Sequence, residues 1–250
     1  MLKSRPVPVA SQTDFMDWQK RRLKYVTASE VPSILGLNGT MNTAADVFTA
    51  KINGARSAPN VFTDHGNANE PVIFDLCLKQ IHGFRGRRSN IMYTNAGVPH
   101  LSATPDGVGR INGEKCLIEI KAPTWKMNRH KKNKYKYQVL TQMLVMDYSV
   151  AVFVWGMPEL EFLDKSEGFI GTPTYKQWCA AAGLPHFDPE SGGMVDASEP
   201  ARARVVYNSI KFDLIRISDF SPEDISWVLE RTKKFWDCLQ TGVLDPEFLL

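Results

Sequence analysis

One stretch of the sequence, residues 101–123, places charged side chains inside a segment with the pattern of a buried β-hairpin. Its short apolar runs, LSATPD and CLIEIK, predict strands over residues 101–106 and 115–121. The glycines and the Asn-Gly pair between these runs predict turns, which we place at Gly107, Gly109 and Asn112-Gly113. The hairpin makes a β-sheet part of the fold, and the chemical inferences below start from it.

The two strands bring three charged side chains together. Successive side chains of a strand point to opposite faces, so Glu119 and Lys121 share one face while Ile118 and Ile120 face a core. Asp106 closes the first strand beside them. Two carboxylates and one ammonium group therefore converge at one end of the hairpin.

This cluster suits a hard divalent cation such as Mg2+. Asp106, Glu119 and the backbone carbonyl of Ile120 would supply oxygen ligands, and water and phosphate oxygens would complete an octahedral shell. The cation would lower the pKa of a bound water, while Lys121 would orient that water or stabilise the developing charge. The alternative is that Glu119 and Lys121 form a solvated pair on the face of an ordinary strand.

A third carboxylate is available from a long helix that we expect over residues 64–80. Gly66 and Glu70 lie four residues apart, and therefore on one face of that helix. Glu70 would add a ligand to the metal site; otherwise it is an exposed helix residue.

Two glutamines form a polar stripe on a later, mainly apolar helix expected over residues 135–146. Gln138 and Gln142 lie one turn apart, and buried amides need hydrogen-bond partners. An active site or a DNA backbone would provide those partners, whereas a stripe that faces solvent would not need them.

Arg22 and Ser29 lie beside the start of a second helix, which we expect to begin with Ser29 as its N-cap. Thr27 and Glu30 have the spacing of a capping box, but that start would put Pro32 too far into the helix. A helix N-terminus attracts phosphate, and an arginine would add a bidentate contact. The alternative is a simple cap beside a solvated arginine.

The net charge of the chain is only +3, from 30 Lys and Arg against 27 Asp and Glu. This value excludes a histone-like polycation and an acidic tail, but it allows a local basic surface. Residues 126–136 contain six Lys or Arg residues. They form either a solvated loop or a contact to a nucleic-acid backbone.

The four cysteines lack a CxxC pair and the five histidines lack HxH or HExxH spacing, so we expect no zinc, iron–sulfur or histidine-ligated metal site. The sequence has no run of about 18 uncharged apolar residues and does not begin with the pattern of a signal peptide. We therefore expect a cytoplasmic protein without a membrane span.

The order of the expected elements indicates an α/β or α+β fold with a mixed sheet. Residues 1–12 are expected to form a loose arm. The expected helices cover residues 14–25, 29–36, 43–54, 64–80, 135–146 and 221–242, and further strands cover residues 84–92 and 149–155. We expect one domain over residues 1–250, with a core at about 14–156, an insertion at about 157–204 and a terminal strand and helix at 205–250.

Five short motifs occur in an order that is typical of one family. They are Trp18…Arg22-x4-Thr27-Ala28-Ser29-Glu30, Gly66-x3-Glu70, Ser102-Ala103-Thr104-Pro105-Asp106-Gly107, Glu119-Ile120-Lys121-Ala122-Pro123 and Gln138-x3-Gln142. Over residues 14–156 the chain resembles the phage lambda exonuclease family, the YqaJ-type viral recombinases, within the PD-(D/E)xK nuclease superfamily. The resemblance implies a restriction-endonuclease-like core in which helices flank a mixed central β-sheet.

The resemblance also implies an activity. Members of the family are 5′→3′ exonucleases that use Mg2+, with Mn2+ as a possible substitute, and digest one strand of linear double-stranded DNA. The remaining 3′ single strand passes to a single-strand annealing protein in recombination. By matching motifs, Asp106, Glu119 and Lys121 form the metal site and Glu70 completes it. The encoding source would be a phage or mobile element, with action in the cytoplasm of the bacterial host.

The family's pocket for the 5′-phosphate matches Arg22 and Ser29, with Thr104 and Gln138 as further members and Gln142 as a further candidate for DNA contact. Family members commonly form ring-shaped homotrimers around DNA. The insertion at about 157–204 has no counterpart that we can place. The remaining alternatives are a structure-specific or restriction-type endonuclease of the same superfamily, and a catalytically silent DNA-binding module.

Overall fold

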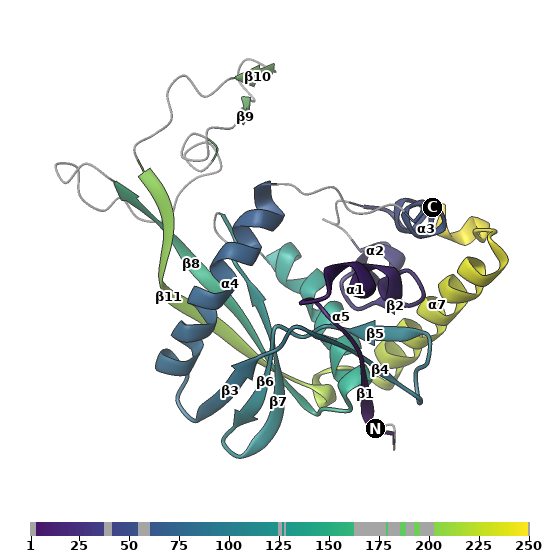
Figure 1. The fold of residues 1–250 in the computed structure, drawn as a ribbon, viewed down its shortest axis with the longest axis horizontal. Coiled ribbons are helices and arrows are strands. Elements are labelled where there is room, and N and C mark those ends of the chain that lie inside the picture. Colours follow the sequence, from purple (N-terminus) through teal and green to yellow (C-terminus); the bar gives the residue numbers. More distant parts are fainter. Residues whose placement is uncertain are drawn as a thin grey trace.

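Two mixed β-sheets, with helices on both sides of the larger one, organise the protein (Figure 1). The computed structural model describes residues 4–37, 42–54, 61–124, 127, 129–162, 179, 186–188, 193–195 and 203–249. This arrangement confirms the predicted fold class. One difference is that most strands divide between a five-stranded and a four-stranded sheet rather than forming one central sheet.

The larger sheet has the strand order β11-β8-β7-β6-β3. Its strands are β3 (Phe84–Arg88), β6 (Gly107–Ile111), β7 (Glu114–Lys121), β8 (Val150–Phe162) and β11 (Ala203–Arg216). β7 and β8 are parallel, and the other neighbours are antiparallel. A parallel pair needs a long crossover, and helix α5 (Arg129–Met146) provides it.

The alternating side chains of β7 pack against a helix on each face of the sheet. Ile118 and Ile120 are fully buried with Ile73 of α4 (Val61–Gln80), which covers one face. Leu117 packs in a second cluster with Leu140 of α5 on the other face (Figure 1). The predicted alternation of β7 is therefore confirmed. Val72 of α4 points away from this core and is 44% exposed.

The smaller sheet has the order β1-β4-β5-β2, with only β2 and β5 parallel. Its strands are β1 (Pro6–Ser11), β4 (Ile91–Asn95), β5 (Leu101–Ala103) and β2 (Val26–Thr27). The prediction of a loose N-terminal arm is wrong for residues 6–11, because they pair with β4. The expected strand over residues 84–92 is likewise divided between the two sheets.

The remaining elements surround these sheets. They are α1 (Phe15–Arg22), α2 (Val31–Ile34), α3 (Ala44–Ile52), α7 (Pro222–Thr241), the short 3-10 turns η1 (Ile217–Asp219) and η2 (Pro246–Phe248), and a small hairpin of β9 (His186–Asp188) and β10 (Gly193–Val195). Capping boxes begin α3 at Thr43 and α7 at Ser221, and Gly242 ends α7 in the left-handed conformation. The predicted starts of α3 and α7 are confirmed.

Gly107 and Gly109 lie inside β6 rather than in turns, which corrects our expectation. A side chain at position 107 would begin 2.8 Å from the Phe74 ring of α4. Glycine is therefore required here by the close approach of helix and sheet, and not by a turn. The Asn112-Gly113 turn is confirmed, with positive φ at both residues.

β8 and β11 form a long antiparallel pair that extends further than predicted. Residues 157–162 continue β8 and pair with residues 203–209, so both ends of the expected insertion belong to this ladder. Residues 163–178, 180–185, 189–192 and 196–202 lie outside the described part of the chain. Among the described residues, no helix has the length and apolar character needed to cross a membrane.

Candidate active site

Glu119 is the most constrained charged side chain at the end of β7. It is only 1% exposed, and it accepts hydrogen bonds from Gln138 Nε2 at 2.5 Å, Gln142 Nε2 at 2.6 Å and Lys121 Nζ. Both glutamines lie on α5 and are buried, so the polar stripe faces the site and not solvent. The sequence indicated that these amides need partners, and the structure supplies a carboxylate.

The Lys121 ammonium group lies between two carboxylates. Burial opposes its charge, but Glu119 and Asp106 favour it, and together they raise the pKa of Lys121 above its usual value. Its Nζ atom is also 5.1 Å from the centre of the Tyr135 ring. Lys121 is therefore a fixed positive charge at this end of the sheet.

Asp106 lies in the short connection between β5 and β6, and hydrogen bonds attach it to β7. Its Oδ2 atom accepts from the backbone N–H of Ile120 at 2.6 Å, and its own N–H donates to the carbonyl of Ile118 at 3.1 Å. Burial raises the pKa of Asp106 well above its usual value, and the neighbouring carboxylates of Glu119 and Glu70 raise it further. Three carboxylates therefore influence one another at this site.

Glu70 and Asp106 line one small cavity of about 220 Å3. The other lining residues are Gln12, Arg88, Ser89, Asn90 and Ile120. Burial raises the pKa of Glu70, with a further increase from Glu119 and opposition from Lys121 and Arg88. The structure thus brings Glu70 beside Asp106 and Ile120, while Glu119 directs its oxygens toward Lys121 and the two glutamines.

Oxygen donors of this kind fit a hard divalent cation. Glu70, Asp106 and Ile120 line one cavity, and the raised pKa values show that the charged forms of the two carboxylates are disfavoured there, a cost that a bound cation would offset. Among the described residues, no three His, Cys, Asp or Glu side chains are arranged as a metal-binding group.

Arg22 and Ser29 form a second small cluster through Thr27. Arg22 Nη2 lies 3.5 Å from Thr27 Oγ1, which is 3.2 Å from Ser29 Oγ, and the guanidinium group covers the Trp18 ring at 4.7 Å. Arg22 Nη2 also lies 3.8 Å from Glu30. The two predicted residues are therefore together, but a carboxylate already accompanies the arginine.

Ser29 is not the N-cap of the second helix, which corrects our expectation. α2 begins after Glu30, whose side chain does not cap the helix but accepts a hydrogen bond from the backbone N–H of Thr27 at 2.8 Å. α2 contains only four residues. Ser29 therefore contributes a hydroxyl group to this cluster, without the support of a helix dipole.

Trp18 links this cluster to the metal-site candidates. Its indole Nε1–H donates to Thr104 Oγ1 at 3.4 Å, and Thr104 lies two residues before Asp106. Thr104 is thus connected to Arg22 through Trp18, whereas Gln138 and Gln142 contact Glu119; the part of each in binding a phosphate stays a prediction. Trp18 was recognised only as part of a motif, because no local signal identifies its partner 86 residues away.

Two cations near these clusters were missed from the sequence. Arg88 lines the cavity with Glu70 and Asp106. The buried Lys51 donates to the carbonyls of Arg22 and Tyr25, at 2.9 and 2.7 Å, and lies 3.0 Å from Glu30. Both positions depend on tertiary packing, since neither residue has a spacing that indicates a site.

Tyr207 of β11 connects the segment after Lys121 to α4. Its hydroxyl donates to the carbonyl of Pro123 at 2.8 Å and lies 2.6 Å from His65 Nε2. Gly156 makes room for the Tyr207 ring, because a side chain there would overlap it. The far end of the chain therefore supports the loop that follows the E-I-K motif.

The predicted basic run lies only partly in the described chain, since Lys126 lies outside it. Lys132 Nζ lies 3.8 Å from the centre of the Trp155 ring and 3.1 Å from Asp213 Oδ2. Lys136 Nζ lies 5.4 Å from the Phe220 ring. Neither interaction tests whether the basic run binds a DNA backbone, so that role stays a prediction.

Comparison with known proteins reveals both a family and a fold. The chain is similar to an alkaline exonuclease, LHK-Exo, from Laribacter hongkongensis, with 17% sequence identity, a TM-score of 0.54 and coverage of 94% of this chain and 95% of that chain. The structure of LHK-Exo in complex with dAMP gives 18% identity, a TM-score of 0.55 and the same coverage. A phage related exonuclease from Haemophilus somnus gives 15% identity, a TM-score of 0.52 and coverage of 87% and 96%.

No curated protein matches the chain. At these low sequence identities, the similarity to the solved structures shows a shared fold and nothing more. The match to the YqaJ-like viral recombinase domain covers residues 17–149, which is more than half of the 250 residues and includes every site residue predicted from the sequence. The chain therefore belongs to the YqaJ-like viral recombinase family.

Proposed function

We propose that this protein is a divalent-metal-dependent exonuclease that degrades one strand of linear double-stranded DNA from its 5′ end. The product would be a 3′ single-stranded overhang, which a single-strand annealing protein would use in recombination. Membership of a viral recombinase family and the fold shared with two exonucleases support this proposal. We further propose Mg2+ as the metal, a homotrimeric ring as the assembly and the cytoplasm of a bacterial host as the place of action.

The observation that carries the proposal is the set of contacts around Glu119. A buried carboxylate that receives hydrogen bonds from two glutamines and an ammonium group is fixed in position, which supports a role in positioning a reacting group. Asp106 and Glu70 lie beside it with raised pKa values. A structural ion pair would not need two further carboxylates at the same strand end.

Glu70, Asp106, Glu119 and the carbonyl of Ile120 would hold the metal ion. When bound, the ion would supply a water of lowered pKa and neutralise charge on the phosphodiester. Lys121 is held positive and would stabilise the negative charge that develops on the phosphate. Gln138 and Gln142 would fix the direction of the Glu119 carboxylate.

Arg22, Ser29 and Thr104 would bind the 5′-phosphate of the strand that is cut. Their cluster joins the metal-site candidates through the hydrogen bond from Trp18 to Thr104. A pocket for a terminal phosphate gives an enzyme that starts at ends, since an internal phosphodiester carries less charge. This feature favours an exonuclease over an endonuclease.

The test is a linear duplex with a 5′-phosphate, labelled at either its 5′ or its 3′ end and incubated with Mg2+ or Mn2+. Early release of the 5′ label as mononucleotide is the expected result. Lys121→Ala should reduce this release by about a hundredfold or more.

A covalently closed plasmid serves as the substrate control and should remain intact. Cleavage of closed circles would contradict the end-dependent activity. Absence of nucleotide release with either metal, or full activity of Lys121→Ala, would contradict the enzymatic proposal itself.

A further inference from the structure

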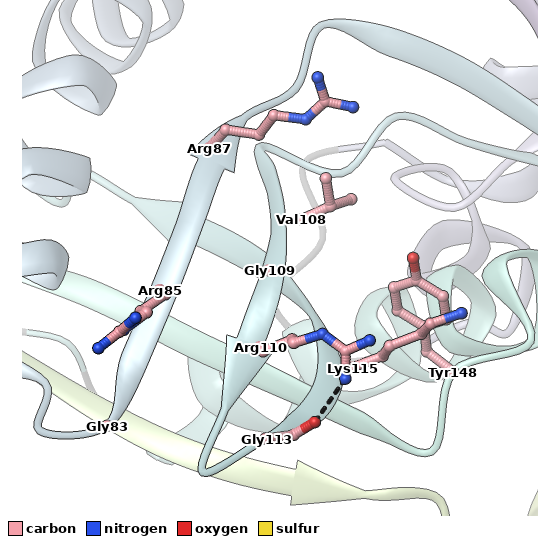
Figure 2. A pocket seen from close by; sticks show the side chains of 9 residues that line it. All are labelled: Gly83, Arg85, Arg87, Val108, Gly109, Arg110, Gly113, Lys115 and Tyr148. Atoms are coloured by element: carbon pink, nitrogen blue, oxygen red, sulfur yellow. Dashed lines mark hydrogen bonds between the residues drawn. The ribbon is translucent and has the colours of Figure 1, made fainter.

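A groove of about 570 Å3 lies on the larger sheet, at the end of β7 away from Lys121 (Figure 2). Besides three glycines, it is lined by Arg85, Arg87, Val108, Arg110, Lys115 and Tyr148. The four cationic residues are exposed, and they come from β3, β6 and β7. The active-site proposal uses none of these side chains.

Three of the cations occupy directly opposed positions across three strands. Arg85 pairs in register with Arg110, and Arg110 pairs in register with Lys115. Neighbouring strands are about 4.8 Å apart, and like charges in directly opposed positions are destabilising. Arg87 lies on the same face, two residues from Arg85.

No carboxylate lines the groove. Among the described residues, none of the four cations forms an ion pair; Arg110 Nη1 instead donates to the carbonyl of Gly113 at 2.6 Å (Figure 2). The adjacent Glu114 is paired with Arg216 at 3.1 Å. The repulsion within this row of cations, Arg85, Arg110 and Lys115, is therefore not compensated by any described carboxylate. An anion bound in the groove would reduce it.

The groove and the cavity of Glu70 and Asp106 are lined by neighbouring residues of one edge strand, whose side chains point to opposite faces of the sheet. β3 is an edge strand, and its successive residues Arg87 and Arg88 line the groove and the cavity of Glu70 and Asp106, respectively. Their Cα atoms are about 3.8 Å apart. The backbone N–H of Ser89 also donates to the carbonyl of Asp106 at 2.9 Å. A strand that leaves the cavity would therefore pass around the edge strand β3 to reach the groove.

We propose that this groove binds single-stranded DNA through its phosphodiester backbone, and that it receives the strand left undigested. The proposal rests on the exonuclease function proposed above. Sites for single strands combine a basic groove with an aromatic side chain for stacking, and Tyr148 lies beside Arg110 and Lys115 in the groove (Figure 2). The volume of about 570 Å3 lies in the range of small-ligand sites.

The test measures binding of a fluorescent oligothymidylate to the full chain by anisotropy, in EDTA so that no cleavage occurs. Arg85→Gln combined with Arg87→Gln should weaken binding by about tenfold at moderate salt. The slope of log K against log salt should decrease by about 1.4, since each single-strand phosphate contact contributes about 0.7. Duplex DNA of the same length should lose less affinity than the oligothymidylate.

A matched control removes two cations elsewhere. Lys79→Gln combined with Lys211→Gln changes exposed residues of α4 and β11, and should leave both affinity and slope unchanged. Arg85→Lys combined with Arg87→Lys keeps the charge and should keep the slope. Lys115→Gln alone gives a second decrease that does not depend on the folding of the double variant.

Equal binding by the wild type and the glutamine double variant would overturn the proposal, as would equal losses in the control. Binding of an acidic peptide to the groove, without binding of the oligothymidylate, would also overturn the proposal. Nucleotide release from a duplex end is measured separately. A wild type without release would refute the exonuclease proposal, while these binding differences would still identify a single-strand site.

Discussion

The two ends of β7 place lysines on the same face of one sheet in opposite surroundings. Lys121 contacts Glu119 and lies near Asp106, so its charge is balanced and its position is fixed. Lys115 lies opposite Arg110 in a groove without a carboxylate. The comparison indicates that balanced charge provides precise geometry for chemistry, whereas unbalanced charge leaves a surface suited to a polyanion. The predictions below test this difference.

The largest expected effect is at the balanced end, with Asp106→Asn. This change removes a carboxylate whose pKa is raised by burial and by its neighbours, while the amide oxygen can still accept from Ile120. Nucleotide release should fall about a thousandfold. Stability in urea should stay equal or increase, because the repulsion among carboxylates is reduced. Loss of stability together with activity would mean that Asp106 has a structural role.

The next prediction concerns how protonation of His100, which lies on neither end of β7, changes the stability of the fold with pH. Burial, with a contribution from Lys233, lowers the pKa of His100 from 6.5 to about 4. The unfolded chain therefore binds this proton at a higher pH than the folded chain, and stability should decrease as pH falls from 6.5 to 4. The decrease should be about 3 kcal/mol.

Urea unfolding at several pH values, with His100→Gln for comparison, checks this expectation. The glutamine can still contact Thr232, which lies 3.0 Å from His100 Nε2. The variant should lose much of the dependence between pH 6.5 and 4. If the free energy of unfolding of the variant changes with pH as much as that of the wild type, groups other than His100 cause the change.

A smaller effect is expected for Arg22→Ala in the phosphate cluster. Removing the guanidinium group should reduce the preference for 5′-phosphorylated over 5′-hydroxyl ends by about tenfold or more. Initial rates on the two substrates measure this ratio. Lys20→Ala, two residues before Arg22 on α1, provides a control for the loss of a positive charge. Equal losses on both ends would remove Arg22 from phosphate recognition.

The smallest effect is expected at the unbalanced end, with Lys115→Thr. Removing one of the opposed cations should stabilise the protein by about 0.5 kcal/mol. Lys211→Thr on β11 is the matched control, since it gives the same change of strand propensity outside the row of cations. If both variants gain the same stability, the groove has no measurable internal repulsion.

The local parts of the site could be predicted from sequence. Strand alternation places Glu119 and Lys121 on one face, and helix spacing places Gln138 and Gln142 together. The hydrogen bonds from these glutamines to Glu119 could not be predicted, because they depend on how α5 packs across β7. The pairing of residues 6–11 with β4 was missed because the segment lacks a clear strand pattern.

The basic groove likewise could not be predicted from the sequence, because it depends on how the strands pair. Arg85, Arg110 and Lys115 come from three strands, and only the sheet register places them in one row. Ser29 was assigned as a cap because it precedes a proline at a tolerated position, whereas Glu30 makes the contacts at that helix start. Glu30 also pairs there with the buried Lys51, a contact between positions that are distant in the sequence.

The hydrogen bond between Tyr207 and Pro123 has a consequence for the order in which the protein is made. Asp106 contacts Ile120 only 14 residues away, so this contact is available early in synthesis. The support from Tyr207 joins positions 84 residues apart, and contacts distant in sequence form after their later partner has emerged from the ribosome. A nascent chain that carries all three carboxylates still lacks this brace until β11 is synthesised, so the loop that follows the E-I-K motif gains its support only after Tyr207 has emerged.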